Sequence, residues 1–111
     1  MNHDQRGALI HLSLVAVRGA VDLIEDDLTE DASPRVMELT EKLARRRALA
    51  HEDPEMFGVV EDTEQALLMA LETERLTRSH ERAEAVWGML RAAGRAAFEV
   101  ALAAVIQRET S

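Results

Sequence analysis

Cysteine is absent from this chain of 111 residues. The absence excludes a disulfide framework, a thiolate zinc site and a cysteine nucleophile. Proteins without disulfides are typical of reducing compartments, so we expect this one to be cytoplasmic.

Aromatic residues, proline and glycine are also scarce. Aromatics make up 3% of the chain, with one tryptophan, two phenylalanines and no tyrosine, so any core must be aliphatic. Two prolines and five glycines leave little turn-forming material for an all-β fold. A chain of this length supports one modest core, and we expect a single helical domain over residues 1–111.

Long uncharged runs are missing as well. The N-terminal stretch MNHDQRGALIHLSLVAV is interrupted by Asp4 and His11, and no small-residue cleavage site follows it. The longest uncharged runs have about half the length of a membrane span. We therefore expect neither a secretory signal nor a membrane partner.

Positive charge is in deficit. Lysine and arginine number 13 against 21 acidic residues, which gives a formal net charge of −8. Binding to duplex nucleic acid requires basic side chains that neutralise phosphates, so we expect no such partner. A basic protein partner is compatible with this charge. All but one of the basic residues are arginine, which is typical of a GC-rich genome, and we expect a bacterial protein.

What the chain does contain is helical periodicity. Apolar residues between positions 4 and 29 alternate spacings of four and three, which is the heptad seam of an amphipathic helix. The seam consists of Ile10, Leu14, Val17, Val21, Ile24 and Leu28, widened on one side by Leu9, Ala16 and Leu23. We predict a helix over about residues 4–29.

A second helix is predicted from Pro34 to about Ala50. Ser33 is a favourable N-cap, and proline suits the first helical position. The apolar positions of this helix are Val36, Leu39 and Leu43. Three arginines at positions 45–47 suit the negative end of the helix dipole.

A short turn and two more helices complete the prediction. Asp53 and Pro54 open the turn, after which Met56, Phe57, Val59 and Val60 are expected in the core. We expect a third helix over residues 62–76, with a capping box of Asp62 and Gln65 and apolar positions at Leu67, Leu68 and Leu71. The stretch LTRSHER either kinks the chain or restarts it at Ser79, and a fourth helix covers residues 80–108.

Short connections make consecutive helices antiparallel, so we expect an all-α, four-helix up-down bundle with long first and last helices. Excess helix length with an exposed apolar seam suggests pairing with a second chain, most simply as a twofold dimer. The fourth helix carries a stripe of small residues, which lets another helix approach closely. The predicted packing or oligomer interface consists of Ala93, Ala97, Ala101 and Ala104 together with Ile10, Leu14, Val17 and Val21.

An acidic protein–protein interaction module is the function that these features favour. It would act as a homo-oligomer. Three roles fit: an adaptor, an inhibitor such as an immunity protein, or an assembly chaperone. A cluster of acidic residues is a candidate docking patch for a basic partner. The alternative interpretation is a corner of the molecule that is solvated and binds nothing. The cluster consists of Glu25, Asp26, Asp27, Glu30 and Asp31.

We expect no metal and no cofactor. His80 has Glu84 four residues on, and His51 has Glu55, so each pair shares a helix face. Neither the H-E-x-x-H motif nor the E-x-x-H motif of carboxylate di-iron bundles occurs.

A small helical enzyme is the alternative. The stretch RRALAHEDPEMF resembles the R-x4–6-H signature of HEPN domains, which are helical proteins that often act as ribonucleases when dimeric. This resemblance implies that Arg46 and His51 handle the scissile phosphate. The stretch VRGAVDLIED is similar to the first helix of helical chorismate mutases, which implies that Arg18 clamps a substrate carboxylate.

Overall fold

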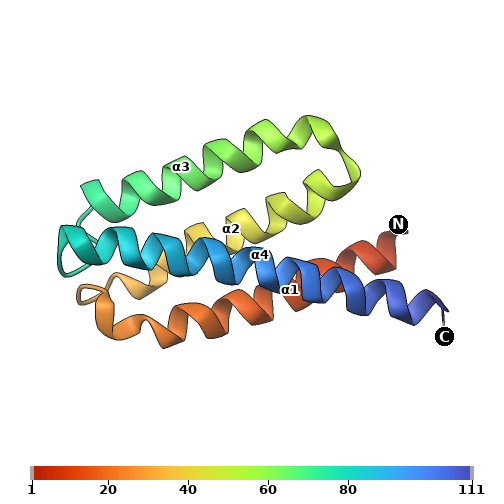
Figure 1. The fold of residues 1–111 in the computed structure, drawn as a ribbon, viewed down its shortest axis with the longest axis horizontal. Coiled ribbons are helices and arrows are strands. Elements are labelled where there is room, and N and C mark those ends of the chain that lie inside the picture. Colours follow the sequence, from red (N-terminus) through yellow and green to blue (C-terminus); the bar gives the residue numbers. More distant parts are fainter. Residues whose placement is uncertain (1, 111) are drawn as a thin grey trace.

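The computed structural model describes residues 2–110, and the side chains as far as residue 107. It is an all-α bundle of four helices, as predicted (Figure 1). The helices are α1 (His3–Leu23), α2 (Ser33–Glu52), α3 (Phe57–Thr73) and α4 (His80–Thr110), with short 3-10 turns η1 (Glu25–Asp27) and η2 (Pro54–Met56). Of these, α4 with 31 residues and α1 with 21 are the longest.

Consecutive helices run in opposite directions, and α4 returns alongside α1 (Figure 1). The most extensive contact is the one between α1 and α4, followed by the contact between α1 and α2. The molecule is elongated, with extents of 46 × 27 × 18 Å.

The core follows the predicted seams. Its main cluster is aliphatic and joins all four helices. Most of the predicted seam is buried, Ile10 is half-buried, and Ala16 and Leu23 on its widened side are exposed; the buried positions are Leu9, Leu14, Val17, Val21, Ile24 and Leu28. The buried apolar side chains of the second helix, Val36, Leu39 and Leu43, also match the prediction.

The first helix ends earlier than predicted, at Leu23 rather than near residue 29. Three acidic residues follow as η1, and carboxylates are unfavourable at the negative C-terminal end of a helix. The backbone at residues 27–29 forms hydrogen bonds with the connection before the last helix instead of continuing the first. The Thr29 N–H donates to the Leu76 carbonyl at 2.8 Å, and the Arg78 N–H donates to the Asp27 carbonyl at 3.2 Å. Leu23 was expected on the seam but is 84% exposed.

The start of the second helix also differs in detail. Ser33 is the first residue of α2 rather than its N-cap, which is Ala32 and makes no side-chain capping bond. Pro34 lies in the first turn, where its missing N–H costs nothing.

The third helix begins at Phe57, five residues before the predicted start. The Asp53 carboxylate accepts a hydrogen bond from the Glu55 N–H at 3.1 Å, so the turn at Pro54 leads directly into helix. Asp62 and Gln65 therefore lie inside α3 and form no capping box. Phe57, expected in the core, is 58% exposed because it stands on the first turn of α3.

The connection between α3 and α4 is a true break. Residues 74–79 lie outside the helices, and the Ser79 hydroxyl accepts a hydrogen bond from the Arg82 N–H at 3.2 Å at the start of α4. Of the two alternatives that the sequence left open, a kink or a restart at Ser79, the structure shows the restart. In the part of the chain that the structure describes, no helix is both long and apolar enough to cross a membrane.

Candidate functional site

One broad side of α1 and α4 is exposed and carries no charge. The residues recur every three or four positions, so they share one side of each helix. We define this α1/α4 face as Ala8, Leu12, Val15, Ala16, Gly19 and Leu23 of α1 with Ala85, Met89, Ala92, Ala93, Ala96, Val100, Ala103 and Ala104 of α4; all are exposed or half-buried. Its largest exposed side chains are Leu23, Val100, Val15 and Met89.

A shallow groove of about 390 Å³ runs along this face between the two helices. Leu12 and Ala16 line it from α1, and the small residues of α4 line it from the other side. Among the residues that the structure describes, no ionisable side chain lines the groove. Small side chains on α4 leave this hollow because they do not fill the space beside α1.

The structure divides the predicted interface residues into two groups. Leu14, Val17 and Val21 are buried inside the chain, and so is Ala101, which packs in a small core cluster with Leu9 and Val105. Ala93, Ala97 and Ala104 are half-buried and line the groove. Ile10 is half-buried between two core clusters.

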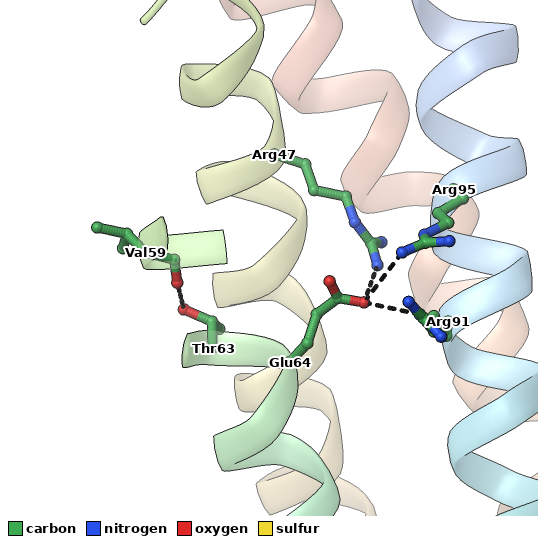
Figure 2. Close-up of polar contacts among 6 residues, drawn as sticks. All are labelled: Arg47, Val59, Thr63, Glu64, Arg91 and Arg95. Carbon is green, nitrogen blue, oxygen red and sulfur yellow. Dashed lines mark hydrogen bonds and ion pairs between the residues drawn. The ribbon is translucent and has the colours of Figure 1, made fainter. Parts of the chain in front are cut away.

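A second feature lies on the other side of the bundle, where Glu64 of α3 is surrounded by three arginines (Figure 2). The same carboxylate oxygen, Oε2, lies 3.5 Å from Nη2 of Arg47, 3.0 Å from Nε of Arg91 and 3.7 Å from Nη2 of Arg95. Arg47 comes from α2 and the other two from α4, so the cluster joins three helices. We call it the Glu64 cluster.

Burial distinguishes Arg47 from the other two arginines of the Glu64 cluster. Its side chain is 10% exposed, whereas those of Arg91 and Arg95 are half exposed. Burial lowers the pKa of Arg47, the attraction of Glu64 raises it, and repulsion by Arg95 lowers it. Gly94 makes room for the guanidinium, because a Cβ there would collide with Nη1 of Arg47.

A cavity of about 380 Å³ opens beside the Glu64 cluster. Arg47, Arg95, Glu61 and Glu64 contribute its charged lining. The remainder of the lining is apolar or aromatic: Ala50, His51, Phe57, Val60 and Phe98. The His51 and Phe98 rings meet edge to face, with centroids 5.8 Å apart. This cavity therefore combines cations with an apolar wall.

The sequence prediction missed the Glu64 cluster, although one signal for it is present. Glu64 falls between Val60 and Leu67, at the spacing that places all three on the buried side of α3. A carboxylate at such a position requires a cationic or hydrogen-bonding partner. The sequence did not indicate which of the arginines supply it.

The structure does not bring Arg46 together with His51. Arg46 points to α3 and donates a hydrogen bond to the Thr63 hydroxyl, while His51 packs against Phe98 of α4. The cavity is lined by His51 and by Arg47, not Arg46. Arg18, the expected carboxylate clamp, is paired with Glu41 of α2 at 2.7 Å.

The acidic cluster forms a corner at the end of α1. Glu25, Asp26, Glu30 and Asp31 are exposed. Asp27 pairs with Arg82 of α4 at 3.2 Å, which neutralises part of the corner.

Glu72, His80 and Glu84 form another group, with one ligand atom of each within 4.8 Å of the others. All three are exposed, and exposed acidic groups of this kind are common without a bound metal. Arg75 and Arg78 line a hollow shared with Glu72 and His80, and their charge opposes cation binding.

Comparisons with protein-family models, with curated proteins and with solved structures give no match to this chain.

Proposed function

We propose that this chain is a protein–protein interaction module that works as a homodimer joined through the α1/α4 face. The observation that carries the proposal is the uncharged, exposed surface that extends over both long helices. Charged residues make up 31% of the chain, yet the fourteen positions of this face include none. An exposed apolar surface rimmed by polar residues is typical of an interaction site.

The size of the face fits a small but specific interface. Positions 85–104 of α4 extend over about 30 Å, and two packed helices present a width of about 20 Å. The face therefore covers about 600 Å² on each copy, or about 1,200 Å² in a dimer. This area is at the lower limit for specific protein–protein interfaces.

Gly19 supports close approach of a second backbone. It lies in the middle of α1, where glycine costs about 0.5–1 kcal/mol relative to alanine. A Cβ at this position would meet nothing within 4 Å in the chain, so packing within the chain does not require the glycine. A helix of another molecule packed against this side would benefit from the missing Cβ.

The absence of charge on the face allows a second copy as the occupant. Two molecules that each carry a formal charge of −8 repel one another, and this repulsion is smallest when the surfaces that meet have no like charges in contact. The α1/α4 face fulfils this condition, and a twofold axis pairs it with itself. The dimer then presents its acidic corner twice to a basic protein, which suits an adaptor, inhibitor or assembly-chaperone role.

A charge placed in the groove tests the proposal. We expect light scattering coupled to size-exclusion chromatography to give twice the monomer mass of 12.3 kDa for the native chain. Ala96→Glu should reduce this to the monomer mass, because two carboxylates would be buried at the interface without partners. Ala96 is exposed in the monomer, so circular dichroism should show unchanged helix content.

Ala66→Glu is the matched control, since it makes the same change at an exposed position of α3, away from the face. It should leave the dimer intact. A native chain that is monomeric at every concentration, or an Ala96→Glu variant that stays dimeric, would refute the proposal.

A further inference from the structure

The Glu64 cluster has more positive charge than its carboxylate can balance. Three guanidinium groups share one oxygen of Glu64, and among the described residues none of the three has another ion-pair partner. Glu61 lines the adjoining cavity and supplies a second negative charge. The lining of the cavity itself holds two arginines, Arg47 and Arg95, and two glutamates, Glu61 and Glu64, so its formal charges balance.

Arg47 has unused donor capacity in this position. A guanidinium carries five N–H donors, and a carboxylate is normally held by two parallel hydrogen bonds. Among the described residues, the only polar partner of Arg47 is Glu64, at 3.5 Å, although nine-tenths of the side chain is buried. A buried cation with so few hydrogen bonds favours the binding of a further acceptor.

The cavity next to Arg47 has the dimensions and lining of a small-molecule site. Its volume of about 380 Å³ is within the range of known ligand pockets, about 300–1,000 Å³. Phe98, Phe57 and Val60 provide an apolar wall, while Arg47 and Arg95 provide cations. Such a lining fits a molecule with an apolar body and an anionic end.

The donors that remain on Arg47 indicate what kind of acceptor the cavity takes. Arginine binds a carboxylate with two parallel hydrogen bonds, which suits the free part of the Arg47 guanidinium.

We propose that this cavity, between α2, α3 and α4, binds a small organic carboxylate with a hydrocarbon or aromatic body. The carboxylate is held by Arg47 and Arg95, and the body packs against Phe98, Phe57 and Val60. Glu64 holds the arginines in place when the cavity is empty. This site is separate from the α1/α4 face, so its test does not depend on dimer formation.

The test is an NMR titration of the 15N-labelled chain with sodium octanoate, with 1-octanol as the neutral counterpart of the same length. Octanoate should cause saturable amide shifts in residues 47–51, 57–64 and 94–98. It should bind about ten-fold more tightly than octanol, because a charge-assisted hydrogen bond is lost with the alcohol.

Two variants test the role of Arg47. Arg47→Met should weaken octanoate binding about ten-fold or more and leave octanol binding unchanged. Arg45→Met is its matched control, because Arg45 is exposed on the same helix and has no ion pair among the described residues. Gly94→Ala keeps every charge but displaces the Arg47 guanidinium, and it should also weaken octanoate binding.

Gly88→Ala is the control for the glycine variant, since a Cβ there meets nothing within 4 Å. If Arg47→Met fails to fold, Gly94→Ala decides the question. Equal affinities for octanoate and octanol would overturn the proposal. So would equal effects of Arg47→Met and Arg45→Met, unchanged octanoate binding in Gly94→Ala, or shifts confined to the α1/α4 face.

Discussion

At the scale of single residues, Glu64 is the side chain that ties three helices together. Its carboxylate is nine-tenths buried and meets arginines from α2 and α4. An ion pair of this kind contributes little compared with an apolar contact, but removing one partner leaves the others without a counter-charge. The Glu64 cluster is therefore sensitive to the loss of its only carboxylate.

We predict that Glu64→Gln lowers the free energy of unfolding by about 2–4 kcal/mol, because Arg47 becomes a buried charge without a counter-ion. This loss of unfolding free energy is smaller than the loss expected for a fully buried ion pair, because Arg91 and Arg95 stay in contact with water. Urea denaturation at neutral pH measures the change. Glu72→Gln is the control: Glu72 is exposed on the same helix, has no ion pair among the described residues and should change stability by less than about 0.5 kcal/mol. A loss no larger than the control's would contradict this account.

The Glu64 cluster shows what the sequence can predict at this scale. The periodicity of α3 places Glu64 among buried positions, so a buried carboxylate is predictable. Its partners are not, because Arg47, Arg91 and Arg95 lie 17, 27 and 31 positions away and meet it only after three helices have packed. Arg46 and Arg47 differ by one position, yet they face different partners on α3.

At the scale of helices, contacts between the ends of elements determine where each one stops. Arg6 near the start of α1 donates from Nε to Glu52 at the end of α2 at 2.8 Å, and this contact closes one end of the bundle. At the other end, Thr29 and Asp27 bond to the connection before α4. Apolar periodicity predicted the helices themselves. It does not encode the contacts at the two ends of the bundle, which go with the observed helix boundaries.

The contact between Arg6 and Glu52 has a predictable pH dependence. The hydrogen bond from Arg6 lowers the pKa of the Glu52 carboxyl below its ordinary value. A carboxyl whose pKa is lower in the folded state stabilises the fold above its unfolded pKa, and the stabilisation is lost as the pH falls through the folded pKa. We expect Glu52→Gln to be less stable than the native chain at pH 7.

This difference should shrink as the pH drops below the ordinary glutamate pKa, about 4.3, and vanish once Glu52 is protonated in both states. Urea denaturation of the native chain and of Glu52→Gln at pH 7 and at pH 3 measures this difference in stability. Glu55→Gln is a control on an exposed glutamate nearby and should show no such convergence. A difference that is independent of pH would show that Glu52 acts by packing alone.

At the scale of the whole molecule, the up-down arrangement follows from four periodic segments joined by short connections. The sequence predicts the up-down arrangement, and it shows a stripe of small residues along α4. It does not predict which of these small residues stay exposed after the helices have packed. Ala101 lies at the floor of the groove and is 3% exposed because it packs with Leu9 and Val105, whereas Ala96 and Val100 line the same groove and are exposed.

The two proposed sites lie on different parts of the bundle and have opposite character. The α1/α4 face is uncharged and extended, which suits a second helical surface. The cavity beside the Glu64 cluster is small and holds a buried arginine with unused donors, which suits a small anion. A dimer joined through the face would leave both cavities open to solvent, since none of their lining residues belongs to the face.

The most direct test of the homodimer is an isotope-filtered NOE experiment on a mixture of 13C-labelled and unlabelled chains. We predict intermolecular NOEs to methyl groups of the α1/α4 face, namely those of Leu12, Leu23, Met89 and Val100. Leu49 and Met69 are also exposed apolar side chains but lie outside the face, and they should give none. Intermolecular NOEs at Leu49 or Met69 and none at the face, or no intermolecular NOEs at all, would contradict the account.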